Sequence, residues 1–173
     1  MRVSNAGQLA DVIRAEGLAV ELTGDPSVLV GPQVVIDSRQ VRPGALFVAL
    51  PGEHVDGADF TVAAAEAGAA ATLVNHPTPA VLTHLIVPDA EAGLSLLGRA
   101  LVRRHRAAGL QTVAITGSSG KTSTKDLLAQ VLEAAGPTVS PQGSFNNEIG
   151  VPLTACEVDE GTRFLISEMG ARA

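Results

Sequence analysis

The sequence lacks several features on which whole classes of protein depend. Its 173 residues include no tryptophan or tyrosine, and only one cysteine, Cys156. Without those aromatic rings, a surface that stacks nucleic-acid bases is not expected. A single thiol excludes an internal disulfide and is typical of a reducing cytoplasm. The net charge of −6 also disfavours broad binding to nucleic acid or to anionic membranes.

Membrane and zinc signals are missing as well. No apolar run approaches the twenty residues that a membrane-spanning helix needs, and the chain does not open with a basic segment followed by an apolar one. The four histidines, His54, His76, His84 and His105, have no metal-ligand spacing. We therefore expect a cytoplasmic protein with no membrane insertion, no secretion and no structural zinc.

Lysine is scarce, and its placement is informative. The basic residues are ten arginines and two lysines, Lys121 and Lys125, which both lie in ITGSSGKTSTKDLL (residues 115–128). A compact ammonium fits inside a ring of backbone amides where a planar guanidinium does not. The placement therefore indicates a site that needs lysine, although chance placement of two residues is the alternative.

The order of apolar patterns predicts an α/β fold. Strands that alternate with helices indicate a largely parallel sheet with helices on its faces. Expected helices cover residues 5–16, 61–67, 89–108 and 122–135, with a short one around Leu153. Expected strands cover residues 34–36, 45–50, 71–74, 84–87, 112–115 and 164–167, with a short one near Val139. We expect a small first domain at residues 1–107 and a second, cut short, at residues 111–173.

The segment TGSSGKT has the setting of a phosphate-binding loop but not the usual spacing. The common pattern G-x-x-x-x-G-K-[ST] would need glycine at position 115, where this chain has isoleucine. An apolar strand still enters the loop and a helix still leaves it, so backbone amides at the helix start can bind an anion. Lys121 would then lie over the β and γ phosphates, with the Thr122 hydroxyl as a Mg²⁺ ligand. The alternative is an ordinary Gly/Ser turn.

Two further segments supply polar groups. In RFLISEMGA, Glu168 follows an apolar strand at the end of the sheet where the loop opens, so it could bind Mg²⁺ directly or through water; a surface acid is the alternative. In GSFNNEIGVPLT, Asn146 and Asn147 could present amides to a ligand or simply cap a loop.

Together these segments resemble the ATP-dependent Mur ligases, which build the peptide stem of the bacterial cell wall. The stretch DSRQVRPGALFVALPGEHVDGADF (residues 37–60) is similar to the uridine-nucleotide domain of that family. TGSSGKTSTKDLL, FNNEIGVPLT and SEMGA look most like the members that add D-alanyl-D-alanine. The resemblance covers nearly the whole chain. It implies a small N-terminal uridine-nucleotide-binding α/β domain followed by the start of a P-loop, mostly parallel-sheet ATPase domain.

The resemblance also implies a reaction and its site. ATP would activate the terminal carboxylate of UDP-N-acetylmuramoyl-tripeptide as an acyl phosphate, which the amine of D-alanyl-D-alanine would then attack. Lys121 and Glu168 would be catalytic, Thr122 and Glu168 would hold Mg²⁺, and Ser38, Arg39, Asn146 and Asn147 would contact substrate. The ATP phosphates would lie against Gly117, Ser118, Ser119, Gly120, Lys121, Thr122 and Ser123. The full-length enzyme would be a monomer.

The length departs from the family pattern, because the family's third domain and modified lysine find no counterpart here. We expect a fragment that cannot catalyse ligation alone. Alternatives are a ligase that adds the third stem residue, a folate- or cyanophycin-type relative, and a non-catalytic UDP-sugar binding module with a vestigial loop. A P-loop switch protein is disfavoured, since nothing resembles guanine-specificity motifs.

Overall fold

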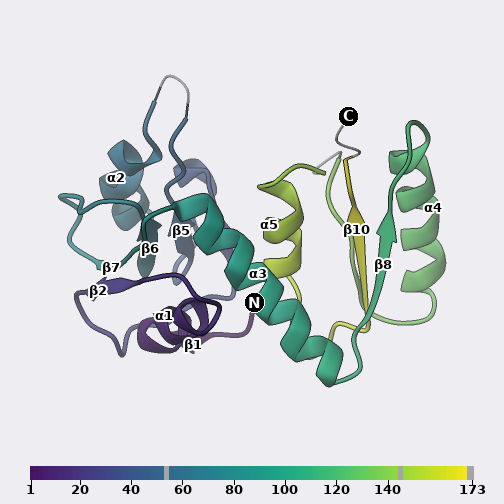
Figure 1. Ribbon diagram of the computed structural model, residues 1–173, viewed down its shortest axis with the longest axis horizontal. Helices are drawn as coiled ribbons and strands as arrows, with labels where there is room; N and C mark the ends of the chain where they lie inside the picture. The colour runs from purple at the N-terminus through teal and green to yellow at the C-terminus, as the bar shows by residue number, and fades with distance from the viewer. Residues whose placement is uncertain (53–54, 144–145, 171–173) are drawn as a thin grey trace.

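The computed structural model describes residues 1–52, 55–143 and 146–170. It arranges them around two larger sheets that lie on either side of a long helix, α3 (Figure 1), and a third sheet consists of two short strands near the N-terminus. Residues outside the described part include His54, Phe145 and Ala171 of the sequences quoted above.

The elements follow the expected alternation. The helices are α1 (Ala6–Ala15), α2 (Thr61–Glu66), α3 (Ala90–Ala107), α4 (Lys121–Glu133) and α5 (Gly150–Cys156), with 3₁₀ turns η1 (Ser38–Gln40) and η2 (Gly57–Phe60). The strands are β1 (Ser4–Asn5), β2 (Glu21–Thr23), β3 (Leu29–Val30), β4 (Val34–Val35), β5 (Leu46–Val48), β6 (Ala71–Val74), β7 (Thr83–Ile86), β8 (Gln111–Ile115), β9 (Thr138–Val139) and β10 (Phe164–Glu168).

The first sheet has the order β2-β7-β6-β5-β4 and is parallel except for β2, which runs antiparallel to β7. Helices cover both of its faces. Ile13 of α1 and Leu94 of α3 pack with Leu73 on one face, while Ala64 of α2 packs with Phe47 on the other. Apolar burial on two faces explains why β6 is buried along its whole length.

The expected helices are confirmed to within a residue or two at their ends. Asn5 caps α1 through a reciprocal pair of hydrogen bonds with Gln8, and Asp89 caps α3. The short strands β1, β2 and β3 were not expected. Strands β4 and β5 pair in parallel, and the segment that connects them contains η1.

The second sheet has the order β8-β10-β9 and is entirely parallel. Helix α4 lies on one side of it and α5 on the other (Figure 1). Helix α5 also packs against α3, where Gly98 approaches Pro152 so closely that a Cβ would lie 3.0 Å from the proline carbonyl oxygen. Cys156 of α5 joins the core of the first sheet, and burial raises the pKa of its thiol to about 12. Helices α3 and α5 thus join the two sheets.

Within the described residues, no helix has both the length and the apolar character needed to cross a lipid bilayer.

Candidate phosphate and metal site

The loop between β8 and α4 has the backbone of an anion site. Gly117 has φ of 150° and Gly120, which precedes the helix, has φ of 75°; both values favour glycine. No side chain among the described residues caps α4. The first amides of this helix are therefore open to an anion, which the helix dipole also favours.

Lys121 lies over this loop. Its ammonium donates a hydrogen bond to the Gly117 carbonyl oxygen at 2.7 Å. Because the lysine begins α4 and its partner begins the loop, the lysine side chain extends from one end of the loop to the other. Ser118 and Ser119 lie exposed within the loop, and Ser123 is exposed in the first turn of α4.

Glu168 stands beside the loop at the carboxyl end of β10. It pairs in register with Ile115, the last residue of β8, and its side chain is buried, with 1% of the residue exposed. The alternative of a surface acid is therefore wrong. Its Oε1 accepts a hydrogen bond from Asn146 Nδ2 at 2.9 Å, and the Thr122 hydroxyl lies 3.4 Å from the same atom. The second distance is longer than an ordinary O–H···O bond.

The two asparagines have different partners. Asn146 reaches Glu168 with its side chain, and its backbone oxygen accepts a hydrogen bond from the Gly170 amide at 2.9 Å. Asn147 instead accepts from the Gly150 amide at 2.8 Å, which fixes the start of α5. Both residues line a hollow of about 400 Å³ together with Ser95 and Met169.

Ser38 and Arg39 lie away from the loop and from Glu168, in η1 of the first unit. The Arg39 guanidinium pairs with the Asp37 carboxylate, with Nη2 to Oδ2 at 2.7 Å. Hydrogen bonds from Arg39 lower the pKa of Asp37 to about 2, and the same pairing raises the pKa of Arg39. Sequence reasoning missed Asp37, although a carboxylate two residues before an arginine at a turn is a usable signal.

Lys125 is the second residue that sequence reasoning left without a role. It lies one turn after Lys121 on α4 and is buried, with 3% of the residue exposed. Its ammonium donates to the carbonyl oxygens of Pro141 and Gly143 at 2.8 and 3.1 Å. The scarcity of lysine drew attention to Lys125 but did not indicate these partners.

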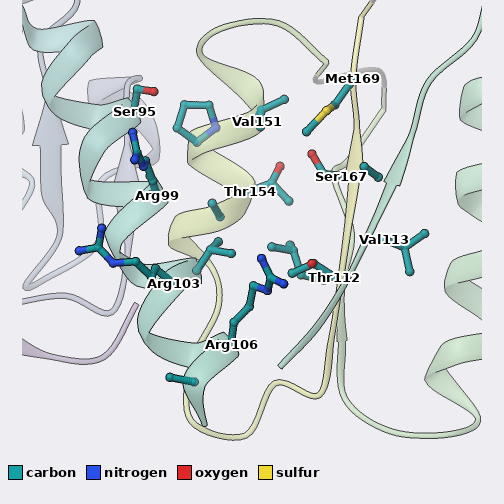
Figure 2. Close-up of a pocket in the computed structure, with 17 residues that line it drawn as sticks. Ser95, Arg99, Arg103, Arg106, Thr112, Val113, Val151, Thr154, Ser167 and Met169 are labelled. Carbon is teal, nitrogen blue, oxygen red and sulfur yellow. The ribbon is translucent and has the colours of Figure 1, made fainter. Parts of the chain in front are cut away.

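A larger cavity lies on the opposite face of the same sheet. It measures about 780 Å³ and is bounded by α3, α5, β8 and β10 (Figure 2). Side chains alternate along a strand, so Ser167 and Met169 line this cavity whereas Glu168, between them, contacts Thr122 of α4. On the α3 side, Arg99 and Arg103 line the cavity, and both also pair with Glu16, which follows α1.

The cluster formed by Thr122, Asn146 and Glu168 fits a magnesium ion better than a transition metal. No group of three or more His, Cys, Asp or Glu side chains able to hold a metal occurs in residues 1–52, 55–143 and 146–170. Magnesium needs no such group, because it is commonly held by one or two protein oxygens, substrate phosphates and water. In the described part of the chain, Glu168 Oε2 is buried and has no hydrogen-bond partner, so this oxygen remains available as a ligand.

Comparison with known families matches residues 33–173 in two consecutive parts. The model described as "Mur ligase family, catalytic domain" matches residues 33–115, and the one described as "Mur ligase middle domain" matches residues 115–173.

Curated relatives agree. The UDP-N-acetylmuramoyl-tripeptide–D-alanyl-D-alanine ligase of Mycobacterium leprae is 41% identical, covering 96% of this chain and 35% of the relative. The Escherichia coli enzyme of the same name is 39% identical, covering 95% and 34%. This chain therefore spans about a third of the length of these relatives.

Solved structures agree as well. A crystal structure of MurF from Acinetobacter baumannii has a TM-score of 0.84 at 31% identity, covering 99% of this chain and 36% of that one. MurF from Thermotoga maritima, solved in complex with ADP, has a TM-score of 0.68 at 32% identity, covering 80% and 32%. With two consecutive family matches, these relatives and this fold, the chain belongs to the Mur ligase family.

Proposed function

We propose that this chain is part of an ATP-dependent ligase that joins D-alanyl-D-alanine to UDP-N-acetylmuramoyl-tripeptide. The observation that carries the proposal is the convergence of Lys121, Thr122, Asn146 and Glu168 at the carboxyl end of a parallel sheet. That end of an α/β sheet is where such folds bind their ligands. The names of the relatives in Mycobacterium leprae and Escherichia coli supply the two substrates.

The proposed reaction has two steps. A carboxylate oxygen of the tripeptide attacks the γ-phosphorus of ATP, so that the bond to ADP breaks and an acyl phosphate forms. The amine of D-alanyl-D-alanine then attacks the acyl carbon, inorganic phosphate leaves, and the nitrogen loses a proton. The protein's contribution is to position the reacting groups and to offset their negative charge.

Each predicted site residue has a role in this scheme. Residues 117–123 would bind the ATP phosphates, with the Lys121 ammonium beside the transferred group. Thr122 and Glu168 would hold Mg²⁺, which when bound offsets charge on the phosphate oxygens. The Asn146 and Asn147 side would face substrate, as the hollow they line suggests.

The first unit would bind the uridine diphosphate portion through Ser38 and Arg39, so we assign residues 1–107 to substrate and residues 111–173 to ATP. An exposed arginine offers planar paired donors to phosphate, and Arg39 is exposed. We place the enzyme in the cytoplasm as a monomer, and the free, buried thiol of Cys156 agrees with a reducing compartment.

Ligation by the full-length protein tests the proposal. With MgATP, tripeptide and D-alanyl-D-alanine, we expect ADP and the pentapeptide product in equal amounts, and no product from Lys121→Met. Replacing the tripeptide by UDP-N-acetylmuramoyl-dipeptide, and D-alanyl-D-alanine by a single amino acid, tests the ligase that adds the third residue. Saturable tripeptide binding that MgATP leaves unchanged, without any ligation, would instead identify a UDP-sugar binding module and overturn the proposal.

A further inference from the structure

We infer that Lys125 is a positioning residue that holds Asn146 against Glu168 and so shapes the magnesium side of the phosphate site. The inference rests on the proposed function for its ligand, but its geometry stands on contacts within the chain. Lys125 does not reach the loop itself. It binds backbone groups of Pro141 and Gly143, which precede Asn146 in the chain.

All three donors of the Lys125 ammonium have acceptors. Two are the carbonyl oxygens of Pro141 and Gly143, at 2.8 and 3.1 Å. The third is the carboxylate of Asp126, at 2.8 Å, whose own side chain is 58% exposed. A buried charge is costly unless it is paired and fully hydrogen-bonded. An apolar side chain would fill the same space without that cost, so we attribute the lysine to the need to hold the two carbonyl groups.

The carbonyl groups belong to the segment that leads to the cluster. Asn146 follows Gly143 by three residues, and its amide reaches Glu168 Oε1 at 2.9 Å. Its backbone oxygen binds the Gly170 amide just beyond β10. The segment is thus fixed to α4 at its start and to β10 at its end.

These contacts close a ring of named groups. Lys125 lies three residues after Thr122 and four after Lys121, so all three share one face of α4. Lys125 binds Gly143, Asn146 follows three residues later in the chain and binds Glu168, and Glu168 contacts Thr122 on the same helix as Lys125. Loss of the Lys125 contacts releases one side of this ring and leaves Lys121 and the loop untouched.

The test compares Lys125→Met, which removes the three donors at similar size, with Asp126→Asn, which removes only the exposed ion pair. Lys125→Arg provides a charged variant whose planar guanidinium cannot reproduce the ammonium geometry. It serves as the second variant if Lys125→Met does not fold. Thermal unfolding of each variant of the intact protein establishes the fraction folded before any comparison.

The first readout needs no nucleotide. We expect Lys125→Met to shift the side-chain amide NMR signals of Asn146 and to speed exchange of the Gly170 amide about tenfold or more, with Asp126→Asn unchanged. Unchanged Asn146 signals and Gly170 exchange in a folded Lys125→Met protein would overturn the inference. This readout stands even if the protein proves not to bind ATP.

The second readout is ADP affinity with and without Mg²⁺, measured by calorimetry. Groups that orient metal ligands typically change metal affinity by about 10–100-fold. We expect Lys125→Met to lose about tenfold or more in affinity with Mg²⁺ and less than about twofold without it. Equal losses under both conditions would indicate general destabilisation and contradict a positioning role. Absence of Mg²⁺-dependent binding in the unmodified protein would count against the proposed function alone.

Discussion

The two sheets use similar strands to different ends. Strand β6 of the first sheet and strand β8 of the second are both parallel and largely apolar, yet every residue of β6 is buried and none of β8 is. The reason is their neighbours: β6 lies between two strands and under helices on both faces, while β8 pairs only with β10 in the described part of the chain. The burial of these strands is thus decided by the elements around them and not by their amino-acid composition.

The buried polar groups of the two sheets also differ, in whether they have hydrogen-bond partners. In the first sheet, Thr72 and His84 satisfy each other at 2.7 Å, and His84 also contacts the Ala80 carbonyl oxygen. In the second, buried Glu168 keeps one carboxylate oxygen without a hydrogen-bond partner among the described residues. Unsatisfied groups are typical of sites prepared for a ligand. Since the larger buried apolar clusters also surround the first sheet, we expect the first unit to supply most of the stability, and the second to keep a buried carboxylate oxygen available to a ligand.

The largest expected effect concerns Cys156, which belongs to α5 but lies in the core of the first sheet. Thiolate is the reactive form, and a pKa raised from 9.0 to about 12 lowers the thiolate fraction about 1,000-fold at neutral pH. We expect reaction with a thiol reagent to be slower by at least that factor than for Val81→Cys, whose position is 98% exposed, made in a Cys156→Ala background. Fast labelling of the folded protein would show that α5 does not pack with the first unit.

Truncation in the first core has the next largest effect. Leu94 of α3 is fully buried against the first sheet. Leu94→Ala should lower the free energy of unfolding by about 2–5 kcal/mol, through lost burial and the cavity left behind. Urea unfolding measures it. A loss below about 1 kcal/mol would contradict the expectation that the first unit supplies most of the stability.

A change at the site should affect binding more than stability. Glu168→Gln keeps an oxygen that can accept from Asn146 but removes the carboxylate, so affinity for MgADP should fall about 10–100-fold, or about 1.4–2.8 kcal/mol. Unfolding free energy should not fall. Glu133→Gln, at an exposed position on α4, is the matched control and should bind as the unmodified protein does. A Glu168→Gln variant that was destabilised but bound MgADP as before would show that Glu168 serves stability and not binding.

The smallest effect is expected on the outer face of α4. Leu127 is 65% exposed, so Leu127→Ala should change the free energy of unfolding by no more than about 0.5 kcal/mol. The same substitution at Leu94 provides the direct comparison in one urea series. A loss at Leu127 that approached the loss at Leu94 would mean that this face is covered in solution.

Sequence reasoning succeeded where the signal is local. The helices expected over residues 5–16 and 89–108 are present, each capped by its first polar residue, and the apolar run of β10 ends at Glu168 as expected. It failed for β1 and β3, which are two residues long each and exist because Ser4 pairs with Val30 far along the chain. It also could not give the direction of β4 relative to β5, which depends on the path taken by η1.

The site residues also differ in whether local sequence signals could identify them. Lys121, Thr122 and Glu168 were identified from strand ends and loop composition, and the described structure brings them together. The hold of Lys125 on Pro141 and Gly143 was out of reach, because it depends on how the segment after β9 returns across α4. Whether these residues bind ATP, Mg²⁺ and substrate stays a prediction.

The close crossing of α3 and α5 at Gly98 has a consequence for motion. A single uninterrupted helix packs on one sheet and, through this crossing, is locked to the helix beside the other, so the two units are expected to move as one rigid block. A ligand that touched both would meet surfaces already set at a fixed separation. The protein would lose little conformational entropy when such a ligand bound. Preorganisation of this kind strengthens affinity without adding a contact.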